Sequence, residues 1–237
     1  MYKRQTKNSS LDISTTKDTR VLYQKYRPAD FSEVRGQDHI VSVLKASIAS
    51  GNISHAYLFS GPRGTGKTSL ARIMARDLGI ADHDTYEIDA ASHRQVADID
   101  ELREQVRTMP YDSPYKMIIL DEVHMLSNHA FNALLKTLEE PPAHAVFILA
   151  TTETEKIPET VVSRCQTFTF KKPNQEILRE TVLNISKKEG FTLEPSAADL
   201  IALLGDGSFR DTQGILQKVI AASSDEKILL AQVETVT

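Results

Sequence analysis

Cysteine is almost missing from this chain, because Cys165 is the one cysteine among its 237 residues. A single thiol can form neither an internal disulfide nor a zinc site built from several cysteines. Such a chain suits a reducing compartment, so we expect a cytoplasmic protein without structural zinc.

Long apolar segments are also missing. No apolar run approaches the roughly 20 residues that a membrane-spanning helix needs, so no membrane partner is expected. The first 20 residues lack the apolar centre of a secretory signal, and their polar composition predicts a disordered tail over residues 1–20. The net charge of −4 gives no overall attraction to nucleic acid, so any contact with DNA must be local.

What the chain does contain is a segment of the form G-x-x-x-x-G-K-T. It follows an apolar run at residues 55–59 and precedes a helical pattern, which is the context of a phosphate-binding loop; a chance glycine-rich turn is the alternative. Backbone N–H groups would surround an anion at the helix N-terminus. Lys67 would meet the β- and γ-phosphates, and the Thr68 hydroxyl would ligate Mg²⁺. The predicted binding residues are Gly61, Pro62, Arg63, Gly64, Thr65, Gly66, Lys67, Thr68 and Ser69.

A second motif is the continuous apolar run at residues 115–120 that ends in Asp121 and Glu122. Strands buried on both faces of a parallel sheet have this composition, and ligands bind at the carboxyl ends of such strands. Asp121 would hold Mg²⁺, directly or through water, and Glu122 would orient and deprotonate an attacking water. The alternative is a solvated pair of acids, which the nearby phosphate loop disfavours.

Strand and helix patterns alternate along most of the chain. This alternation predicts an α/β fold with a parallel five-stranded sheet and helices on both faces. We expect a nucleotide-binding domain over residues 21–172 and a small all-α domain over residues 173–237, in which no strand is evident. The strands are expected near residues 55–60, 85–89, 115–120, 145–150 and 166–170; the helices are expected near 38–50, 67–78, 95–107, 127–140, 174–188, 196–204, 209–223 and 229–236.

Three polar residues later in the chain give weaker signals. Thr152 ends a buried strand and could hydrogen-bond a γ-phosphate or a water, although threonine is also simply a common strand residue. Arg164 precedes the last strand, where an arginine is most often a surface charge. Arg210, near the start of a helix in the second domain, could reach the phosphates or pair with Asp211.

Together these segments resemble the gamma/tau family of bacterial DNA polymerase III clamp-loader subunits, which are AAA+ ATPases. The resemblance covers about residues 21–223, and its most selective part is DEVHMLS followed by FNALLKTLEEPP. It implies a RecA-like P-loop AAA+ domain followed by a helical lid domain. The other runs that carry it are GPRGTGKTS, LATTE, SRCQTF and GSFRDT.

The resemblance also implies roles for single residues. Thr152 matches the first sensor, on a strand between the phosphate-loop strand and the acidic strand. Arg164 matches an arginine finger that acts in trans on the nucleotide of a neighbouring subunit, and Arg210 matches the second sensor. Arg27 and Val34 lie in stretches that line the adenine pocket. Helices that face DNA would begin near Ser92-His93-Arg94 and near Ser127-Asn128.

The sequence departs from the family pattern in two places. The family inserts a four-cysteine zinc module after the phosphate-loop helix, where this chain has only residues 78–84 and no cysteine. His83 beside two aspartates could suggest a metal, but a surface loop is the simpler interpretation. The family also continues into a helical collar domain that holds a pentamer together, whereas this sequence ends at Thr237.

These observations predict an ATPase that uses ATP and Mg²⁺ within a clamp loader. Its expected partners are other loader subunits, a sliding clamp and primer-template DNA. Two alternatives stay open at this point. One is a different DNA-remodelling AAA+ ATPase, such as a branch-migration helicase motor; the other is a structural loader subunit that does not hydrolyse ATP.

Overall fold

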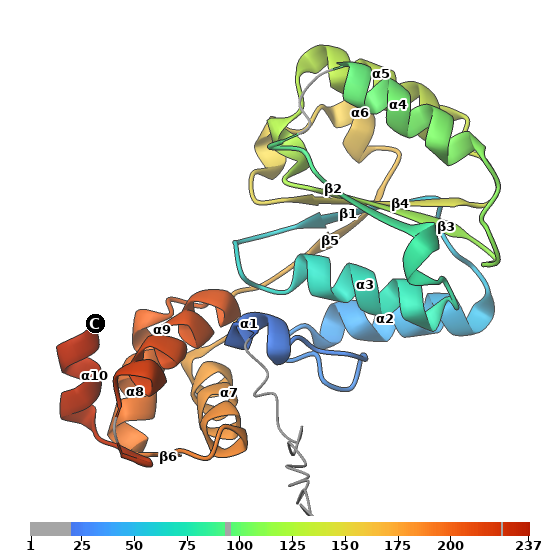
Figure 1. Ribbon diagram of the computed structural model, residues 1–237. Helices are drawn as coiled ribbons and strands as arrows, with labels where there is room; N and C mark the ends of the chain where they lie inside the picture. Colours follow the sequence, from blue (N-terminus) through green and yellow to red (C-terminus); the bar gives the residue numbers. More distant parts are fainter. Residues whose placement is uncertain (1–19, 93–95, 224) are drawn as a thin grey trace, which may run out of the picture.

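The computed structural model describes residues 20–92, 96–223 and 225–237. An α/β domain with helices on both faces of a sheet is followed by a smaller helical lid (Figure 1). Residues 1–19 of the predicted tail lie outside the described residues. The elements of the α/β domain are α2 (Asp38–Ser50), β1 (Ala56–Ser60), α3 (Lys67–Asp77), η1 (Asp82–Asp84), β2 (Thr85–Asp89), α4 (Val96–Arg107), β3 (Lys116–Asp121), η2 (Val123–Met125), α5 (Asn128–Glu139), β4 (Ala145–Thr151), η3 (Thr154–Lys156), α6 (Glu159–Val162) and β5 (Gln166–Thr169).

The five strands form a parallel sheet in the order β2-β3-β4-β1-β5. Strand β4 therefore lies between the strand that leads into the phosphate loop and the strand that ends in Asp121. Ser60 at the end of β1 pairs with Thr151, and Leu120 pairs with Leu149. Because all strands run the same way, their carboxyl ends bring the predicted motifs to one edge of the sheet.

The sheet is buried on both faces, which explains its continuous apolar strands. Tyr57 and Phe59 of β1 face the layer of α2 and α3, whereas Leu58 faces the layer of α4 and α5, and all three are fully buried. Side chains alternate between the two faces of a strand, so each strand supplies both layers of the core. This packing fixes the position of the loops at the sheet's carboxyl edge.

The lid is a bundle of helices next to the carboxyl edge of the sheet (Figure 1). Leu22 of the first helix packs into the apolar core of the lid, so a segment that precedes the sheet domain in sequence also stabilises the lid. The predicted boundary near residue 172 stays a prediction. The elements are α1 (Leu22–Lys25), α7 (Gln175–Lys188), β6 (Thr192–Leu193), α8 (Pro195–Leu204), α9 (Phe209–Ala222), β7 (Lys227–Ile228) and α10 (Leu230–Val236).

The expectation of no strand after residue 173 is wrong in one detail. The two-residue strands β6 and β7 pair in parallel, with Thr192 opposite Lys227 and Leu193 opposite Ile228. The N–H group of Thr192 donates to the carbonyl oxygen of Glu226 at 2.7 Å. Two residues are too few to show the alternating pattern by which a strand is identified in a sequence.

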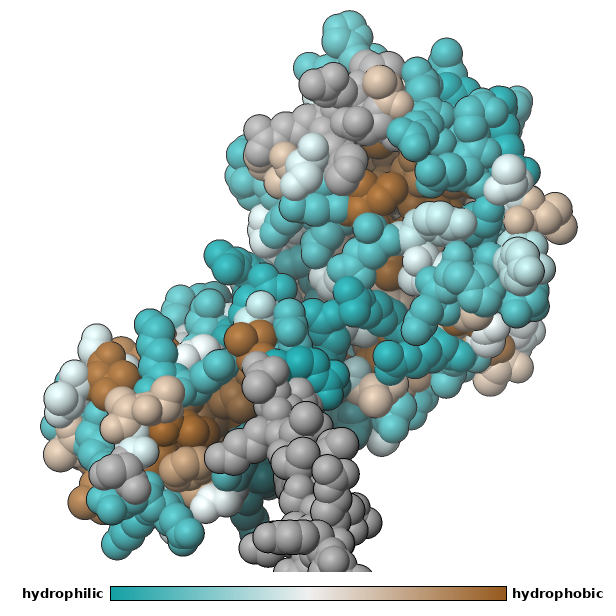
Figure 2. Space-filling model, in the orientation of Figure 1, coloured by the Kyte–Doolittle hydropathy of each residue, from teal (hydrophilic) through white to brown (hydrophobic). Residues whose placement is uncertain are grey.

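Hydrophilic side chains cover most of the face shown in Figure 2, including the junction between the two domains, while apolar residues show on parts of the lid. Leu203, Leu204 and Leu229 are among the exposed apolar side chains of the lid. Within the described ranges, no helix is long and apolar enough to cross a membrane.

Candidate nucleotide-binding site

The glycine-rich segment forms a loop between β1 and α3 that only glycine can occupy at two of its positions. Gly61 has a φ of 139°, and a Cβ there would lie 2.5 Å from the carbonyl oxygen of Phe170. Gly64 has a φ of 73°, and its Cβ would lie 2.0 Å from Oγ of Ser208 in the lid. Both positions combine a left-handed backbone with a close neighbour, so a side chain at either would displace the loop.

Lys67 begins α3 and points back over this loop. Its Nζ donates to the carbonyl oxygens of Gly61 at 2.8 Å and Pro62 at 3.0 Å, and the side chain is almost completely buried. Burial lowers the pKa of Lys67, the carboxylates of Glu122 and Asp121 raise it, and Arg210 lowers it further. Among the described residues, the hydrogen-bond acceptors of this ammonium are carbonyl oxygens alone, so an anion entering the loop would offer it a stronger partner.

Thr68 and Asp121 come together as the sequence predicts for a magnesium site. The Thr68 hydroxyl donates to Oδ2 of Asp121 at 2.8 Å, although the two residues are 53 positions apart. A hydroxyl and a carboxylate are hard oxygen donors, which is the kind of ligand that Mg²⁺ prefers beside phosphates. The pair therefore fits the cation that accompanies a bound nucleotide.

Glu122 follows β3 in a left-handed backbone conformation, with φ of 48°. This conformation is uncommon outside glycine and is often found at functional positions. Its Oε2 accepts a hydrogen bond from the Thr152 hydroxyl at 3.0 Å. The carboxylate is thus oriented by a residue at the end of the neighbouring strand β4, while it still lines the cavity described below.

His124 adds a contact to this carboxylate that the sequence analysis did not assign. Its ring is buried, with Nδ1 3.4 Å from Oε2 of Glu122 and 3.1 Å from the Thr151 hydroxyl. Its Nε2 lies 3.2 Å from Oε1 of Glu153. The histidine was visible within the motif DEVHMLS, but only the fold brings it between the two glutamates.

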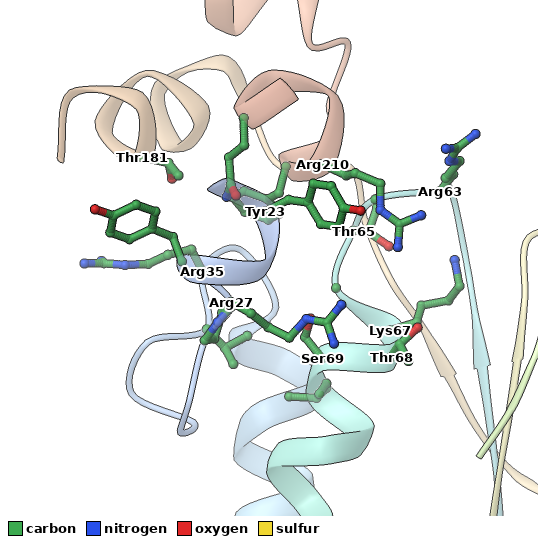
Figure 3. A pocket seen from close by; sticks show the side chains of 18 of the residues that line it. Tyr23, Arg27, Arg35, Arg63, Thr65, Lys67, Thr68, Ser69, Thr181 and Arg210 are labelled. Carbon is green, nitrogen blue, oxygen red and sulfur yellow. The ribbon is translucent and has the colours of Figure 1, made fainter. Parts of the chain in front are cut away.

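A cavity opens between the phosphate loop, the N-terminal segment and the lid (Figure 3). Lys67 and Thr68 lie at one end of it, and Arg35 and Thr181 lie toward the other. Both domains therefore contribute walls, as a site for an elongated ligand requires. The predicted residues that line it are Arg27, Val34, Arg63, Gly64, Thr65, Gly66, Lys67, Thr68, Ser69, Asp121, Glu122 and Arg210.

Positive side chains gather in this cavity. The Arg210 guanidinium lies over the ring of Tyr23, with its Cζ 5.5 Å from the ring centroid, and does not make the predicted alternative pair with Asp211 among the contacts described. Burial lowers the pKa of Arg27, and the nearby charges of Arg72 and Arg210 lower it further. Lys67, Arg27 and Arg210 thus form a cluster that a polyanion would stabilise.

The other predicted residues lie outside the cavity wall. Gly61 and Pro62 hold the Lys67 ammonium, and Thr152 acts on the cavity only through Glu122. Arg164 is remote. It donates to the carbonyl oxygen of Thr160 and pairs with Glu139, both at 2.6 Å.

Sheet topology explains the remoteness of Arg164. Gln166, two residues later, pairs with Tyr57 near the start of β1, whereas the phosphate loop leaves the other end of β1 after Ser60. Because β1 and β5 are parallel, Arg164 lies toward the opposite edge of the sheet from its own phosphate loop. Its side chain is 34% exposed, so part of it is accessible from the solvent.

The sequence analysis missed several lining residues. Tyr23, Thr181, Phe209 and Gln213 line the cavity from α1, α7 and α9. Phe209 lies within the run GSFRDT that carries the resemblance, whereas the sequences of the helices that hold Tyr23, Thr181 and Gln213 gave no local signal for a cavity position. Tyr26 and Arg35 also line the cavity, next in sequence to the predicted residues Arg27 and Val34.

Asp84 joins the loop after α3, where the resemblance implies a zinc module, to the segment before β3. Its carboxylate accepts N–H groups of Tyr111 at 2.7 Å, Asp112 at 3.3 Å and Ser113 at 3.2 Å. Burial raises the pKa of Asp84, but these hydrogen bonds outweigh it and lower the pKa to about 2. His83, Asp84 and Asp112 lie close enough to share an ion, yet the Asp84 oxygens are already engaged by the backbone. The absence of structural zinc stays a prediction.

Of the two segments expected to face DNA, only the one at Ser127-Asn128 lies fully within the described residues. His93 and Arg94 lie outside the described residues. Helix α5 begins at Asn128, close to the predicted start, because Oγ of Ser127 accepts the N–H of Ala130 at 3.2 Å and caps the helix. This contact explains the start of the helix, and a role in DNA contact stays a prediction.

The fold and the site define the class of protein: a RecA-like AAA+ P-loop module with a helical lid. The structure of the Holliday junction branch-migration motor RuvB from Thermotoga maritima superposes with a TM-score of 0.75 over 89% of this chain and 71% of that chain. At 21% sequence identity, the likeness concerns the fold alone.

Sequence comparison narrows the class to a family. Residues 36–93 and 80–174 match the family model "DNA polymerase III, delta subunit". The chain belongs to this family of DNA polymerase III subunits. It is 44% identical to subunit tau of Bacillus subtilis over 86% of the chain, and 42% identical to subunit gamma of Buchnera aphidicola over 85% of the chain. The predicted gamma/tau resemblance is thereby confirmed as homology.

The chain is shorter than these relatives. It spans 40% of the length of the B. subtilis protein, 35% of subunit tau of Escherichia coli and 60% of the Buchnera protein. The activities of these longer relatives are therefore only proposed for this chain.

Proposed function

We propose that this chain is an ATP-binding and ATP-hydrolysing subunit of a DNA sliding-clamp loader. The observation that carries the proposal is the arrangement at the carboxyl edge of the sheet. There, Thr68 lies 2.8 Å from Asp121, and Glu122 is held by Thr152 at 3.0 Å, beside the phosphate loop. Binding residues and a candidate base thus share one cavity.

In this proposal each residue has a defined task. Lys67 leaves the carbonyl oxygens of Gly61 and Pro62 and binds the β- and γ-phosphates. Thr68 and Asp121 hold Mg²⁺, which neutralises charge on the phosphates when bound. Glu122 accepts a proton from the attacking water, and Thr152 keeps its carboxylate oriented. Arg210 reaches the phosphates from the lid.

Arg164 would complete the site of another subunit. Its own phosphate loop lies at the other edge of the sheet, so it can stabilise transition-state charge only in trans. This requires a head-to-tail arrangement of subunits, in which the Arg164 surface of one meets the cavity of the next. The homology to DNA polymerase III subunits supports other loader subunits as the neighbours.

The proposed work of this ATPase is the opening and loading of a sliding clamp on primer-template DNA. ATP binding would draw neighbouring subunits together, and contact with DNA would trigger hydrolysis and release. The family membership supports this role in replication. The fold is shared with a branch-migration motor, so the fold alone does not distinguish a clamp loader from such a motor.

Two substitutions test the chemistry. Lys67→Ala should abolish ATP binding, because it removes the charge that meets the phosphates. Glu122→Gln should keep binding and stop hydrolysis, since an amide preserves the shape of the side chain but is no base. Nucleotide titration and a turnover assay on both variants separate the two effects.

A capture assay tests the biological role. The chain is incubated with the sliding clamp and the other loader subunits, with and without ATP, and the bound proteins are identified. ATP-dependent capture of the clamp together with loader subunits is the expected result. ATP-dependent unwinding of branched DNA by the chain without any clamp would instead identify a helicase motor.

A further inference from the structure

A buried imidazole lies between two carboxylates beside the nucleotide cavity. His124 follows Glu122 by two residues, and its side chain is only 6% exposed. One ring nitrogen, Nε2, lies 3.2 Å from Oε1 of Glu153. The other, Nδ1, lies 3.4 Å from Oε2 of Glu122 and 3.1 Å from the Thr151 hydroxyl. The ring thus links the turn after β3 to the segment after β4.

These partners assign a hydrogen to each nitrogen of the ring. A carboxylate only accepts hydrogen bonds, so Nε2 donates to Glu153. On the other side, a hydrogen on Nδ1 lies between the hydroxyl oxygen of Thr151 and Oε2 of Glu122. A bare nitrogen there would instead direct its lone pair at the Glu122 carboxylate. With two N–H groups, the ring bridges the two carboxylates.

The contacts of Glu122 converge on one of its two oxygens. The Thr152 hydroxyl donates to Oε2 at 3.0 Å, and Nδ1 of His124 lies beside the same oxygen. Among the described residues, no hydrogen bond or ion pair reaches Oε1. A carboxylate held at one oxygen from two directions has little freedom to rotate, so Oε1 remains as the oxygen that can take a proton.

Glu153 anchors the far side of the ring. Its Oε2 pairs with Lys156 at 2.6 Å, and its backbone N–H donates to the Thr151 hydroxyl at 3.0 Å. The hydrogen bond from Lys156 lowers the pKa of Glu153, and the charge of His124 lowers it further. The anchor is therefore an ionised carboxylate on a fixed backbone, which can keep the buried ring in place.

We infer that His124 is a positioning residue for ATP hydrolysis, which holds Oε2 of Glu122 and so directs Oε1 toward the attacking water. This inference rests on the proposed role of Glu122 as the base. His124 itself does not line the cavity, so it acts on the reaction only through Glu122. Its loss should therefore slow turnover without weakening the binding of ATP.

The test compares three substitutions of His124, by leucine, asparagine and glutamine. His144→Leu is the matched control, because His144 is a half-buried histidine that donates to the Val106 carbonyl oxygen at 2.9 Å, at the opposite edge of the sheet. ATP turnover is measured with partner subunits, clamp and primed DNA present, and ATP affinity is measured by calorimetric titration. Thermal melting shows which variants are folded.

His124→Leu should lower turnover about 10-fold, while ATP affinity stays within about two-fold. His124→Asn should recover most of the turnover, because its amide nitrogen is bonded to Cγ, as Nδ1 is, and can donate to Glu122. His124→Gln retains a donor only near the place of Nε2, so its turnover should stay close to that of His124→Leu. A side chain that merely fills space would not favour the shorter amide. The His144→Leu control should keep full turnover.

The anchor offers a second test outside the protein interior. Glu153→Ala should lower turnover about three-fold, since the ring loses its partner but keeps its place. Added to His124→Leu, the same substitution should cause no further loss, because ring and anchor act through one contact.

Three results would overturn the inference while leaving the proposed function intact. They are full turnover by folded His124→Leu, a loss of ATP affinity as large as the loss of turnover, and an asparagine variant no faster than the glutamine variant. If His124→Leu does not fold, Glu153→Ala decides, and full turnover by that variant overturns the inference. Absence of turnover in the unchanged assembly would instead contradict the proposed function itself.

Discussion

Removal of Arg164 should abolish the turnover that depends on neighbouring subunits without weakening ATP binding. In the structure this guanidinium binds Glu139 and the carbonyl oxygen of Thr160, at the opposite edge of the sheet from its own phosphate loop. Arg164→Ala therefore leaves every residue of the cavity wall in place. Nucleotide affinity should stay within about two-fold, whereas the assembled ATPase rate should fall by about 10³- to 10⁵-fold.

The contact with Glu139 does not prevent this role. Both side chains are partly exposed, and ion pairs of this kind contribute only about 0.2–1 kcal/mol. The transition-state contribution of an arginine finger corresponds to about 4–7 kcal/mol, from the same range of rates. Because the arginine finger contributes more free energy than the ion pair, Arg164 should leave Glu139 when a neighbour's nucleotide is within reach. Glu139→Ala should accordingly change the rate only a few-fold.

A mixing assay separates action in trans from action within one subunit. Arg164→Ala subunits have intact phosphate loops, and Lys67→Ala subunits have intact arginines, so each alone should be inactive. In an equal mixture half of the subunits carry a working loop, and half of these meet a working arginine, which restores about a quarter of the rate. ATPase rates are measured with partner subunits, clamp and primed DNA present. An inactive mixture, or fast turnover by dilute Arg164→Ala alone, would refute the reasoning.

Two further predictions concern single contacts, and a third concerns zinc. Thr152→Val removes the hydrogen bond to Glu122, so turnover should fall about 10- to 100-fold with unchanged ATP affinity, as measured by turnover and binding assays. Asp84→Asn should lower the free energy of unfolding by about 2 kcal/mol at pH 7, because the folded pKa of about 2 lies below the ordinary 3.8. The stabilisation is present above about pH 4 and lost as pH falls through 2, so the unfolding free energies of both proteins from urea titrations should start to converge below about pH 4 and meet near pH 2. Elemental analysis should find no zinc after dialysis against a chelator; stoichiometric zinc held near His83 would contradict this.

Most of the fold could be predicted because its signals are local. The apolar runs before Gly61 and Asp121 match β1 and β3 to within a residue, since strands buried on both faces have no alternation to misinterpret. Ser127 correctly marked the start of α5, because its hydroxyl caps the helix. The pair of β6 and β7 was missed, since its register depends on the contact between two loops of the lid.

In the candidate site, too, contacts between sequence motifs could be predicted, whereas contacts that depend on the folded backbone could not. The contact between Thr68 and Asp121 could be predicted from two motifs that follow neighbouring strands. The contact of His124 with Glu122 could not, because it depends on the left-handed turn at Glu122. Gln213 carries no sequence signal at all. Its place in the cavity wall follows from the packing of α9 against the phosphate loop, which only the three-dimensional structure shows.

The contacts between the lid and the phosphate loop explain why nucleotide binding should control the relative position of the two domains. Ser208 packs where a side chain at Gly64 would lie, and the Phe209 N–H binds the Gly64 carbonyl oxygen at 3.0 Å. The next residue, Arg210, faces the cavity from the lid. A ligand that contacts Lys67 and Arg210 together favours one lid position, and its affinity depends on that position in return. In the proposed reaction, hydrolysis would remove the γ-phosphate, which Lys67 and Arg210 would both contact. The position of the lid should therefore depend on the state of the nucleotide.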